Sequence, residues 1–301
     1  MDFTFVLNIQ CFNMKKIIPI ALLAIATFWL ACSAPTPETT SQQSNTMEPS
    51  NKEKVIALLE SIETGDTAPI AYINPDKYIQ HNLSAADGLQ GFGELLKNLP
   101  PNSTKVKVVR AFEDGDYVFT HSKYEFFGPK VGFDVFRFEN GLIVEHWDNL
   151  QERPESANPS GRTMLDGPTT VTDEANTAAN KALAEKFVNT ILVEGKMDQL
   201  AGFFDGDNYM QHNPGVPDQL SGLGAALEQM AKQGIVMKYD KVHRVLGQGN
   251  FVLVISEGTL GGVHKAFYDL FRMEQGKVAE HWDTIETIPA KEEWKNDNGK
   301  F

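Results

Sequence analysis

The chain has 301 residues, of which 42% are hydrophobic and 10% aromatic, so it is long enough to bury two ordinary globular cores. Its formal net charge of −13 argues against nucleic acid or an anionic membrane surface as a partner. Both cysteines, Cys11 and Cys32, lie near the N-terminus. The rest of the chain therefore contains no disulfide, no thiol nucleophile and no cysteine metal site.

The N-terminal residues predict a leader and not a folded element. Lys15-Lys16 precede an apolar run over residues 17–30, which is too short for a comfortable transmembrane helix. We expect residues 1–32 to be a signal segment with Met14 as the true start, and residues 33–51 to be a flexible tether. Cys32 resembles the lipidated cysteine of bacterial lipoproteins, which implies an exported, membrane-anchored protein on the periplasmic or cell-surface side. An ordinary cleaved signal is the alternative.

After the tether, the same order of elements is predicted twice. Each copy begins with an amphipathic helix, and Gly65 or Gly195 follows as a helix stop. The expected helices cover residues 55–62, 78–82 and 92–99, then 183–192, 209–213 and 223–232. The expected strands cover 105–112, 117–126, 131–138 and 142–150, then 237–246, 251–260, 263–273 and 277–285. Helices followed by antiparallel strands predict an α+β fold.

Three short motifs also occur twice. Tyr78-Ile79-Gln80-His81-Asn82 returns about 131 residues later as Tyr209-Met210-Gln211-His212-Asn213. Asp134-Val135-Phe136-Arg137 and Glu145-His146-Trp147-Asp148 return about 135 residues later as Asp269-Leu270-Phe271-Arg272 and Glu280-His281-Trp282-Asp283. These distances indicate a duplicated domain. We expect one domain over residues 52–151, a linker over 152–178 and a second domain over 179–301.

The last hairpin of each copy decides which side chains share a face. Asn140-Gly141 alone favours a two-residue type I′ turn, but its counterpart is Gln275-Gly276, and Gln tolerates a positive φ poorly. We therefore expect a three-residue loop in both copies. That register places Asp134 directly opposite His146, and Asp269 opposite His281. A one-residue slip would instead pair Asp134 with Trp147.

With this register the two faces of the hairpin differ in character. One face, which is typical of a pocket lining, carries Asp134, Phe136, Val144, His146 and Asp148. The other, which is typical of a half-exposed or contact surface, carries Phe133, Val135, Arg137, Ile143, Glu145 and Trp147. His121 is a further pocket candidate, and its counterpart Ile255 indicates that the two pockets are not equivalent. Trp147 and Trp282 are expected to serve packing or an interface.

The three motifs resemble the SnoaL-like branch of the nuclear transport factor 2-like (NTF2-like) superfamily, over about 240 residues. The resemblance implies two cone-shaped α+β barrels, each a curved antiparallel sheet over three helices, arranged as an intramolecular pseudo-dimer. It also implies a pocket for a small, mostly apolar molecule with a carbonyl or hydroxyl group. Cofactor-free acid–base chemistry would follow: isomerisation, cyclisation, dehydration or aldol-type condensation. A non-enzymatic ligand-binding lipoprotein and a tandem-domain scaffold remain open, because this fold does not choose a function.

The resemblance carries over to a set of His and Asp residues as the candidate catalytic groups. The set is Asp134, His146 and Asp148 with His81 on the helix side, and Asp269, His281 and Asp283 with His212 in the second copy. A carboxylate beside an imidazole fixes its tautomer and raises its basicity, which suits proton abstraction near neutral pH. In this hypothesis Asp134 is the base, His146 its partner, and His81 a donor to an enolate oxygen.

Three other roles remain open for these residues. The acid and the imidazole could form a buried structural pair or bind a ligand without chemistry, and His81 could belong to a helix cap. Two His and one Asp could also hold a divalent ion. The segments lack the short spacing of a dedicated metal motif, so we expect no metal. The resemblance implies that no organic cofactor is used.

Overall fold

The computed structural model describes residues 48–100 and 103–301. The predicted signal segment, the lipidation site at Cys32 and most of the tether lie outside these residues. Residues 47–301 form one compact unit that contains both copies of the repeat. Within the described residues, no helix is both long and apolar enough to cross a membrane.

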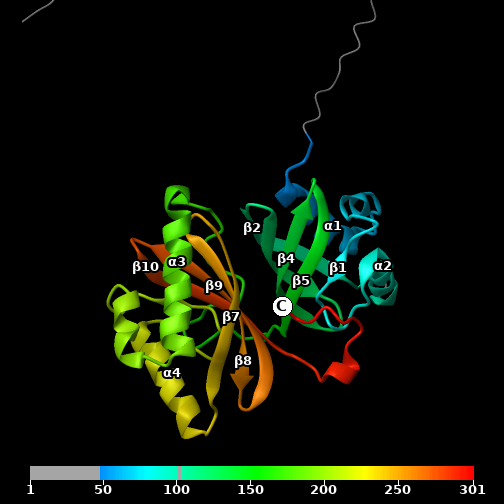
Figure 1. Cartoon of the computed structure of the whole chain (residues 1–301). Helices are drawn as coiled ribbons and strands as arrows, with labels where there is room; N and C mark the ends of the chain where they lie inside the picture. Colours follow the sequence, from blue (N-terminus) through cyan, green and yellow to red (C-terminus); the bar gives the residue numbers. More distant parts are fainter. Residues whose placement is uncertain (1–47, 101–102) are drawn as a thin grey trace, which may run out of the picture. The chain divides into compact units, whose positions relative to one another are not determined.

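The first copy contains one five-stranded sheet with helices on one side (Figure 1). Its elements are α1 (Asn51–Thr64), the 3-10 helix η1 (Ala68–Tyr72), β1 (Ile79–Gln80), α2 (Gly88–Asn98), β2 (Lys105–Asp114), β3 (Tyr117–Glu125), β4 (Pro129–Glu139) and β5 (Leu142–Glu152). Ser50 and Glu53 form a capping box at the start of α1, and Gly65 ends it with φ 73°, as predicted. The strand order is β1-β5-β4-β3-β2.

The second copy repeats this order, β6-β10-β9-β8-β7, in its own sheet. Its elements are η2 (Glu174–Asn176), α3 (Thr177–Phe187), the π-helical turn η3 (Val188–Val193), η4 (Met197–Phe203), β6 (Met210–Gln211), α4 (Leu220–Lys232), β7 (Met237–Gln248), β8 (Phe251–Leu260), β9 (Val263–Glu274), β10 (Lys277–Thr287) and η5 (Lys291–Glu293). Two sheets of identical order confirm the predicted α+β class and the two-domain architecture.

The second helix predicted in each copy is wrong. Residues 78–82 and 209–213 contain a short strand, which pairs in parallel with the last strand of the sheet: Gln80 with His146, and Gln211 with His281. Each sheet is therefore mixed and not purely antiparallel. Backbone pairing with the sheet outweighs a weak local preference in so short a segment.

The predicted hairpin loop is also wrong. Both turns have two central residues with positive φ, 51° and 77° at Asn140-Gly141 and 51° and 72° at Gln275-Gly276, as type I′ requires. A β-bulge then shifts the register by one residue between Arg137 and Phe138. Asp134 consequently pairs with Asp148, and His146 with Phe136, instead of Asp134 with His146. The second copy has the same shift, which pairs Asp269 with Asp283.

The bulge preserves the predicted facing of the His and Asp residues. The turn alone would reverse the two faces, but the extra residue restores them, so Asp134, His146 and Asp148 still share one face. The predicted place of Ile143 is wrong, because it pairs with Phe138 and belongs to the helix-side core.

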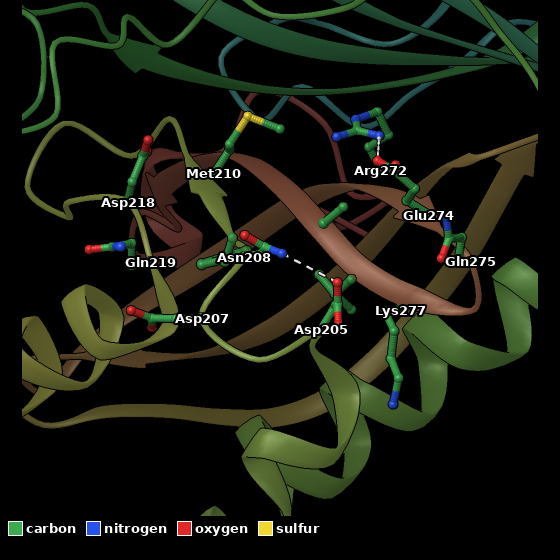
Figure 2. Close-up of a pocket in the computed structure, with 13 residues that line it drawn as sticks. Asp205, Asp207, Asn208, Met210, Asp218, Gln219, Arg272, Glu274, Gln275 and Lys277 are labelled. Carbon is green, nitrogen blue, oxygen red and sulfur yellow. Dashed lines mark hydrogen bonds and ion pairs between the residues drawn. The ribbon is translucent and has the colours of Figure 1, made fainter.

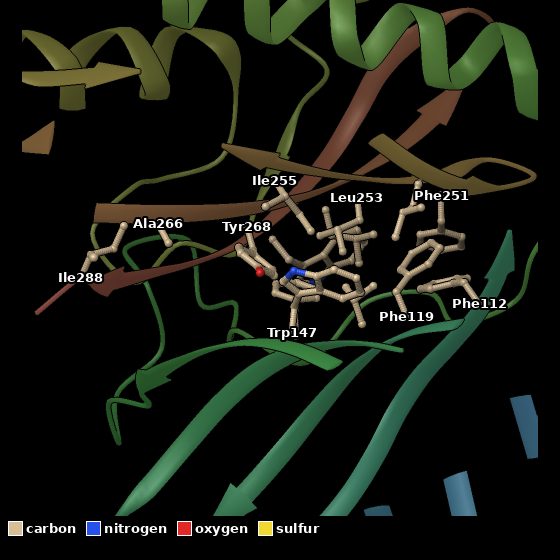
Figure 3. Close-up of a cluster of buried hydrophobic side chains, with 14 of the residues drawn as sticks. Phe112, Phe119, Trp147, Phe251, Leu253, Ile255, Ala266, Tyr268 and Ile288 are labelled. Atoms are coloured by element: carbon tan, nitrogen blue, oxygen red, sulfur yellow. The ribbon is translucent and has the colours of Figure 1, made fainter. Parts of the chain in front are cut away.

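The opposite faces of the two sheets pack on each other and form one core (Figure 3). The first copy contributes Phe112, Phe119, Phe133, Val135 and Trp147; the second contributes Phe251, Leu253, Ile255, Tyr268, Leu270 and Trp282, among others. Arginines cross this core, since Arg110 lies 4.5 Å from the ring of Trp282 and Arg244 lies 3.9 Å from the ring of Trp147. The interface role predicted for both tryptophans and the internal pseudo-dimer are confirmed.

Each copy also receives a segment that follows the sheet of the other. Asn158, after β5, donates its side-chain amide to the carbonyls of Gln211 and Val216. In the same way Asn296, after β10, donates to the carbonyls of Asn82 and Ala85. The tail after β10, red in Figure 1, therefore lies against the loop that follows β1.

Candidate functional site

The sheet brings Asp134, His146 and Asp148 together in the first copy. They project from β4 and β5 onto the helix-covered face, and each is buried. Nε2 of His146 lies 3.4 Å from Oδ1 of Asp134. Thr120 and Tyr124 donate their hydroxyl groups to Oδ2 of Asp134, at 3.2 and 2.5 Å. Oδ1 is thus the oxygen of Asp134 that faces the imidazole.

Gln80 fixes the tautomer of His146. The backbone N–H of Asn82 donates to Oε1 of Gln80 at 2.8 Å, which identifies that atom as the amide oxygen. Oε1 lies 3.0 Å from Nδ1 of His146, so Nδ1 carries the hydrogen that it donates. Nε2 is therefore the nitrogen that faces Asp134.

An apolar cavity of about 90 Å³ adjoins this cluster. The wall consists mostly of Leu58, Leu59 and Ile62 of α1, Phe92, Leu95 and Leu96 of α2, Phe136 and Leu150 of the sheet, and Phe126, which directly follows β3. The polar lining is Tyr78, Gln80, Asn82, Tyr124, Asp134, His146 and Asp148. Burial, together with the Asp134 carboxylate, raises the pKa of the Tyr124 phenol well above its ordinary value, so the phenol stays a hydrogen-bond donor.

The second copy repeats the cluster with Asp269, His281 and Asp283. Nε2 of His281 lies 2.9 Å from Oδ1 of Asp269, and Nδ1 lies 3.0 Å from Oε1 of Gln211. Burial lowers the pKa of His281, but the hydrogen bond to Asp269 and the charges of Asp283 and Asp269 outweigh it, so the net shift is upward. Burial also raises the pKa of Asp283.

The phenol that contacts the aspartate comes from a different strand in each copy. In the first copy Tyr124 on β3 lies opposite Val106 on β2, whereas in the second Gly258 on β8 lies opposite Tyr239 on β7. Tyr239 stacks on Phe267 with ring centroids 4.2 Å apart and donates its hydroxyl to Asp269. The tyrosine is thus on β3 in the first copy and on β7 in the second, with a small residue opposite it in each case. This exchange changes the side chains that surround Asp134 and Asp269.

A lysine distinguishes the first cluster further. Lys300, in the tail after β10, places Nζ 3.6 Å from Oδ1 of Asp148 and also pairs with Glu286. Its side chain is 5% exposed. The matching position after β5 is Arg162, which pairs with Asp218 and not with Asp283. Among the described residues, no lysine or arginine forms an ion pair with Asp269 or Asp283.

The predicted pocket role of His81 and His212 is wrong. His81 stacks on Trp147, and its ring nitrogens contact the carbonyl of Gly299 and the carboxylate of Glu145. His212 stacks on Trp282 in the same way and contacts Glu280. Because side chains alternate along a strand, Gln80 and Gln211 take the pocket face and the histidines take the inter-sheet face.

His121 does not line the pocket either. It lies on the inter-sheet face of β3, stacked on Phe133 at 4.4 Å, and its Nδ1 accepts a hydrogen bond from Arg110 at 3.0 Å. Burial, then the charge of Arg110 and the neighbouring His212, lower the pKa of His121 well below its ordinary value. It is a neutral core histidine.

Sequence reasoning missed five residues that shape the two clusters: Gln80, Gln211, Tyr124, Tyr239 and Lys300. Both glutamines lie inside the repeated motif, directly before the histidines that were assigned to the pocket. Lys300 had its own signal, because Asn158-x-x-Gly161-Arg162 returns 138 residues later as Asn296-x-x-Gly299-Lys300.

A larger surface crevice, of about 630 Å³, lies elsewhere on the second copy (Figure 2). Its carboxylates already have partners within the chain: Asp207 accepts from Ser221, Asp218 from Arg162, and Glu274 from Arg272. Hydrogen bonding in the crevice is thus satisfied locally. We place the candidate site in the smaller cavity, where buried ionisable groups face hydrocarbon.

Two residue sets have the composition of a metal site. They are Asp134, His146 and Asp148, and Asp269, His281 and Asp283; in each set the ligand atoms lie within 4.8 Å of one another. Each set offers one imidazole and two carboxylates, unlike the two-His set considered from the sequence.

No family model matches the sequence, and no curated protein matches it. Among solved structures, the chain is similar to an NTF2-like protein of unknown function from Cytophaga hutchinsonii, with 19% identity over 40% of this chain and 95% of that one, and a TM-score of 0.30. A SnoaL-like polyketide cyclase from Agrobacterium tumefaciens has 12% identity over 36% of this chain and 91% of that one, with a TM-score of 0.29.

An NTF2-like protein of unknown function from Burkholderia xenovorans has 17% identity over 35% of this chain and 86% of that one, with a TM-score of 0.31. These neighbours cover 35%, 40% and 36% of the chain. Similarity at this level carries no information on substrate or activity.

Proposed function

We propose that the first copy binds a small, mostly apolar carbonyl compound and transfers a proton on it with Asp134 and His146. The observation that carries this proposal is the position of the pair, which is buried at the wall of a hydrocarbon-lined cavity. A carboxylate and an imidazole of fixed tautomer, in a site of low dielectric, form a general acid–base pair.

The roles follow from the hydrogen bonds. Asp134 accepts the proton from the carbon beside the carbonyl through Oδ1, since Oδ2 is occupied by Thr120 and Tyr124. His146 exchanges that proton with Asp134 through Nε2, while Gln80 holds Nδ1. In a β,γ-unsaturated ketone the electron pair of the broken C–H bond forms a dienolate. Returning the proton to the γ-carbon moves the double bond into conjugation and completes an isomerisation, so no group outside the chain is needed to balance the step.

The cavity volume limits the ligand. About 90 Å³ is smaller than the roughly 150 Å³ of an engineered apolar cavity that binds benzene. The cavity is therefore smaller than one that is known to admit benzene, and a ligand of that size or larger must displace some of the residues that line it.

Deuterium exchange tests the proposal without knowledge of the natural substrate. Acetone, 2-butanone and cyclohexanone are incubated with the protein in D₂O, and loss of the α-protons is followed by NMR. We expect acceleration for the two smaller ketones and loss of it, by about 100-fold or more, in Asp134→Asn.

The matched control is Asp269→Asn, which removes the corresponding carboxylate from the second copy. It should leave exchange within about twofold of the unmodified protein. Equal exchange in Asp134→Asn and the unmodified protein would exclude the carboxylate from the chemistry. Ketone binding without any acceleration would identify the first copy as a binding module.

A further inference from the structure

The second His–Asp cluster has the composition and spacing of a metal-binding site. Asp269, His281 and Asp283 are all more than nine-tenths buried, and their ligand atoms lie within 4.8 Å of one another. Nε2 of His281 and Oδ1 of Asp269 are 2.9 Å apart. Two adjacent ligands on one ion, each about 2.1 Å from it, are separated by about 3 Å.

One carboxylate oxygen in this cluster has no partner. Asn213 donates to Oδ2 of Asp283 at 2.7 Å, but Oδ1 of Asp283 is buried and accepts no hydrogen bond. Asp283 itself is 7% exposed. A buried carboxylate oxygen without a donor is costly, and a cation in contact with it removes that cost.

The charges of the cluster are also unbalanced. Two carboxylates face each other, and the only cationic group that pairs with them among the described residues is His281. Even with a protonated imidazole the set carries one net negative charge. In the first cluster the matching Oδ1 of Asp148 also accepts no hydrogen bond, but the ammonium group of Lys300 lies 3.6 Å from it and supplies a positive charge.

The imidazole of His281 is oriented as a ligand. The backbone N–H groups of His212 and Asn213 both donate to Oε1 of Gln211, which identifies it as the amide oxygen. Nδ1 of His281 donates to that oxygen, so Nε2 is the nitrogen that faces the two carboxylates and is available to an ion. Metal-bound histidines commonly donate their second N–H to a carbonyl in this way.

We propose that Asp269, His281 and Asp283 bind one divalent transition-metal ion, through Nε2 and one oxygen from each carboxylate. One imidazole and two carboxylates suit Zn²⁺ or Mn²⁺ better than ions that prefer oxygen alone. The ion balances both carboxylates and gives Oδ1 of Asp283 its partner. This site is independent of the chemistry proposed for the first copy.

The test compares two matched variants of the full chain. The protein is stripped with EDTA, dialysed against Zn²⁺ or Mn²⁺, and its bound metal is measured by mass spectrometry. We expect about one equivalent in the unmodified protein and in Asp148→Asn, and a loss of at least tenfold in affinity in Asp283→Asn. The melting temperature should rise with metal concentration in the first two proteins only.

Surface imidazoles require their own control. His243 and His264 both contact Glu257 near the surface and could take up zinc adventitiously. The variant His243→Ala should still bind about one equivalent of metal, whereas Asp283→Asn should not.

Absence of stoichiometric binding in the unmodified protein would overturn the proposal. Binding that survives in Asp283→Asn, or that is lost from Asp148→Asn as well, would do the same. If Asp283→Asn does not fold, visible absorption of Co²⁺ bound to the unmodified protein decides instead: we expect bands that an equivalent of Zn²⁺ displaces, and their absence rejects the site.

Discussion

The two clusters have the same framework and different surroundings. Each copy places an Asp–His–Asp set on the last two strands of its sheet, with a glutamine from the short parallel strand on the imidazole. What differs comes from neighbouring elements: the strand that supplies the phenol, and the tail that supplies Lys300. The Asp–His–Asp set is thus the same in both copies, while the residues around it differ. The surroundings of ionisable groups determine their acid–base and binding properties.

The tyrosine beside the cluster is on β3 in the first copy and on β7 in the second. This change of strand alters the surroundings of the second cluster while the core stays packed. A side chain at Gly258 would place its Cβ 2.0 Å from the carbonyl oxygen of Lys238, so only glycine fits there. Tyr239, directly opposite, restores the lost volume. A swap that conserves volume across a strand pair costs little, whereas either change alone leaves a void or a clash.

Tyr239→Val should have the largest effect, because it gives the second copy the small residue of the first without the compensating Tyr124. The void left beside Phe267 should lower the free energy of unfolding by about 3 kcal/mol. Urea denaturation measures this loss. The new cavity should also take up benzene, which would raise the melting temperature of the variant and not that of the unmodified protein.

Tyr239→Phe is the control for this experiment, since it keeps the ring and removes only the hydroxyl group that donates to Asp269. Its cost should be about 1 kcal/mol, with no response to benzene. Equal costs for the two variants would mean that Tyr239 does not fill the space.

Lys300→Met removes the cation that distinguishes the first cluster. The carboxylates of Asp148 and Glu286 would be left facing each other, and we expect a loss of about 2 kcal/mol at neutral pH. This figure is below that of a fully buried pair, because Glu286 is partly exposed. The loss should shrink as the pH falls and the carboxylates gain protons.

Denaturation at several pH values checks the prediction for Lys300. The double variant Lys300→Met with Glu286→Gln should recover part of the loss, since one of the two uncompensated charges is gone. A cost that is independent of pH and unrelieved in the double variant would show that Lys300 stabilises by packing alone.

His121→Ile introduces the residue that the second copy carries at this position. The pKa of His121 lies well below its ordinary value, so below about pH 6.5 the unfolded chain binds a proton that the folded protein does not. With respect to His121, the free energy of unfolding is therefore constant above that pH. Below it, the free energy of unfolding falls by up to about 1.4 kcal/mol per pH unit. His121→Ile should remove this slope between pH 6.5 and 5.5.

The measurement for His121 is the free energy of unfolding against pH in both proteins. Arg110 loses one acceptor in the variant but keeps the carbonyls of Leu165, Asp166 and Pro168, so the change at neutral pH should be small. Parallel curves for the two proteins would mean that His121 titrates normally in the folded state.

Much of the fold could be predicted from the sequence, because periodicity and repeated motifs report local order. The strands followed from alternation and the duplication from the repeated motifs. The face shared by Asp134 and His146 was predicted correctly only because the bulge offsets the error in the predicted turn. The short parallel strand at Gln80 could not be predicted, because only its pairing with β5 makes it a strand. That strand decides which of Gln80 and His81 reaches the pocket, so the site prediction failed there for the same reason. The repeated Asn-x-x-Gly pattern marks Lys300, but its contact with Asp148 depends on a tail that crosses to the other copy, and the pattern does not show that crossing.

The hairpin turns provide the smallest effect and the most direct comparison between the two copies. Asn140 and Gln275 both have φ 51°, a conformation that costs an ordinary side chain about 1 kcal/mol more than it costs Asn. The second turn is formed despite Gln275, because the bulge behind it aligns His281 and Asp283 with the buried face. Gln275→Asn should therefore stabilise the protein by about 0.5 kcal/mol, and Asn140→Gln should destabilise it by a similar amount. Urea midpoints measured side by side would reveal both shifts; changes of the same sign would mean that contacts of these side chains, and not their φ angles, control the turns.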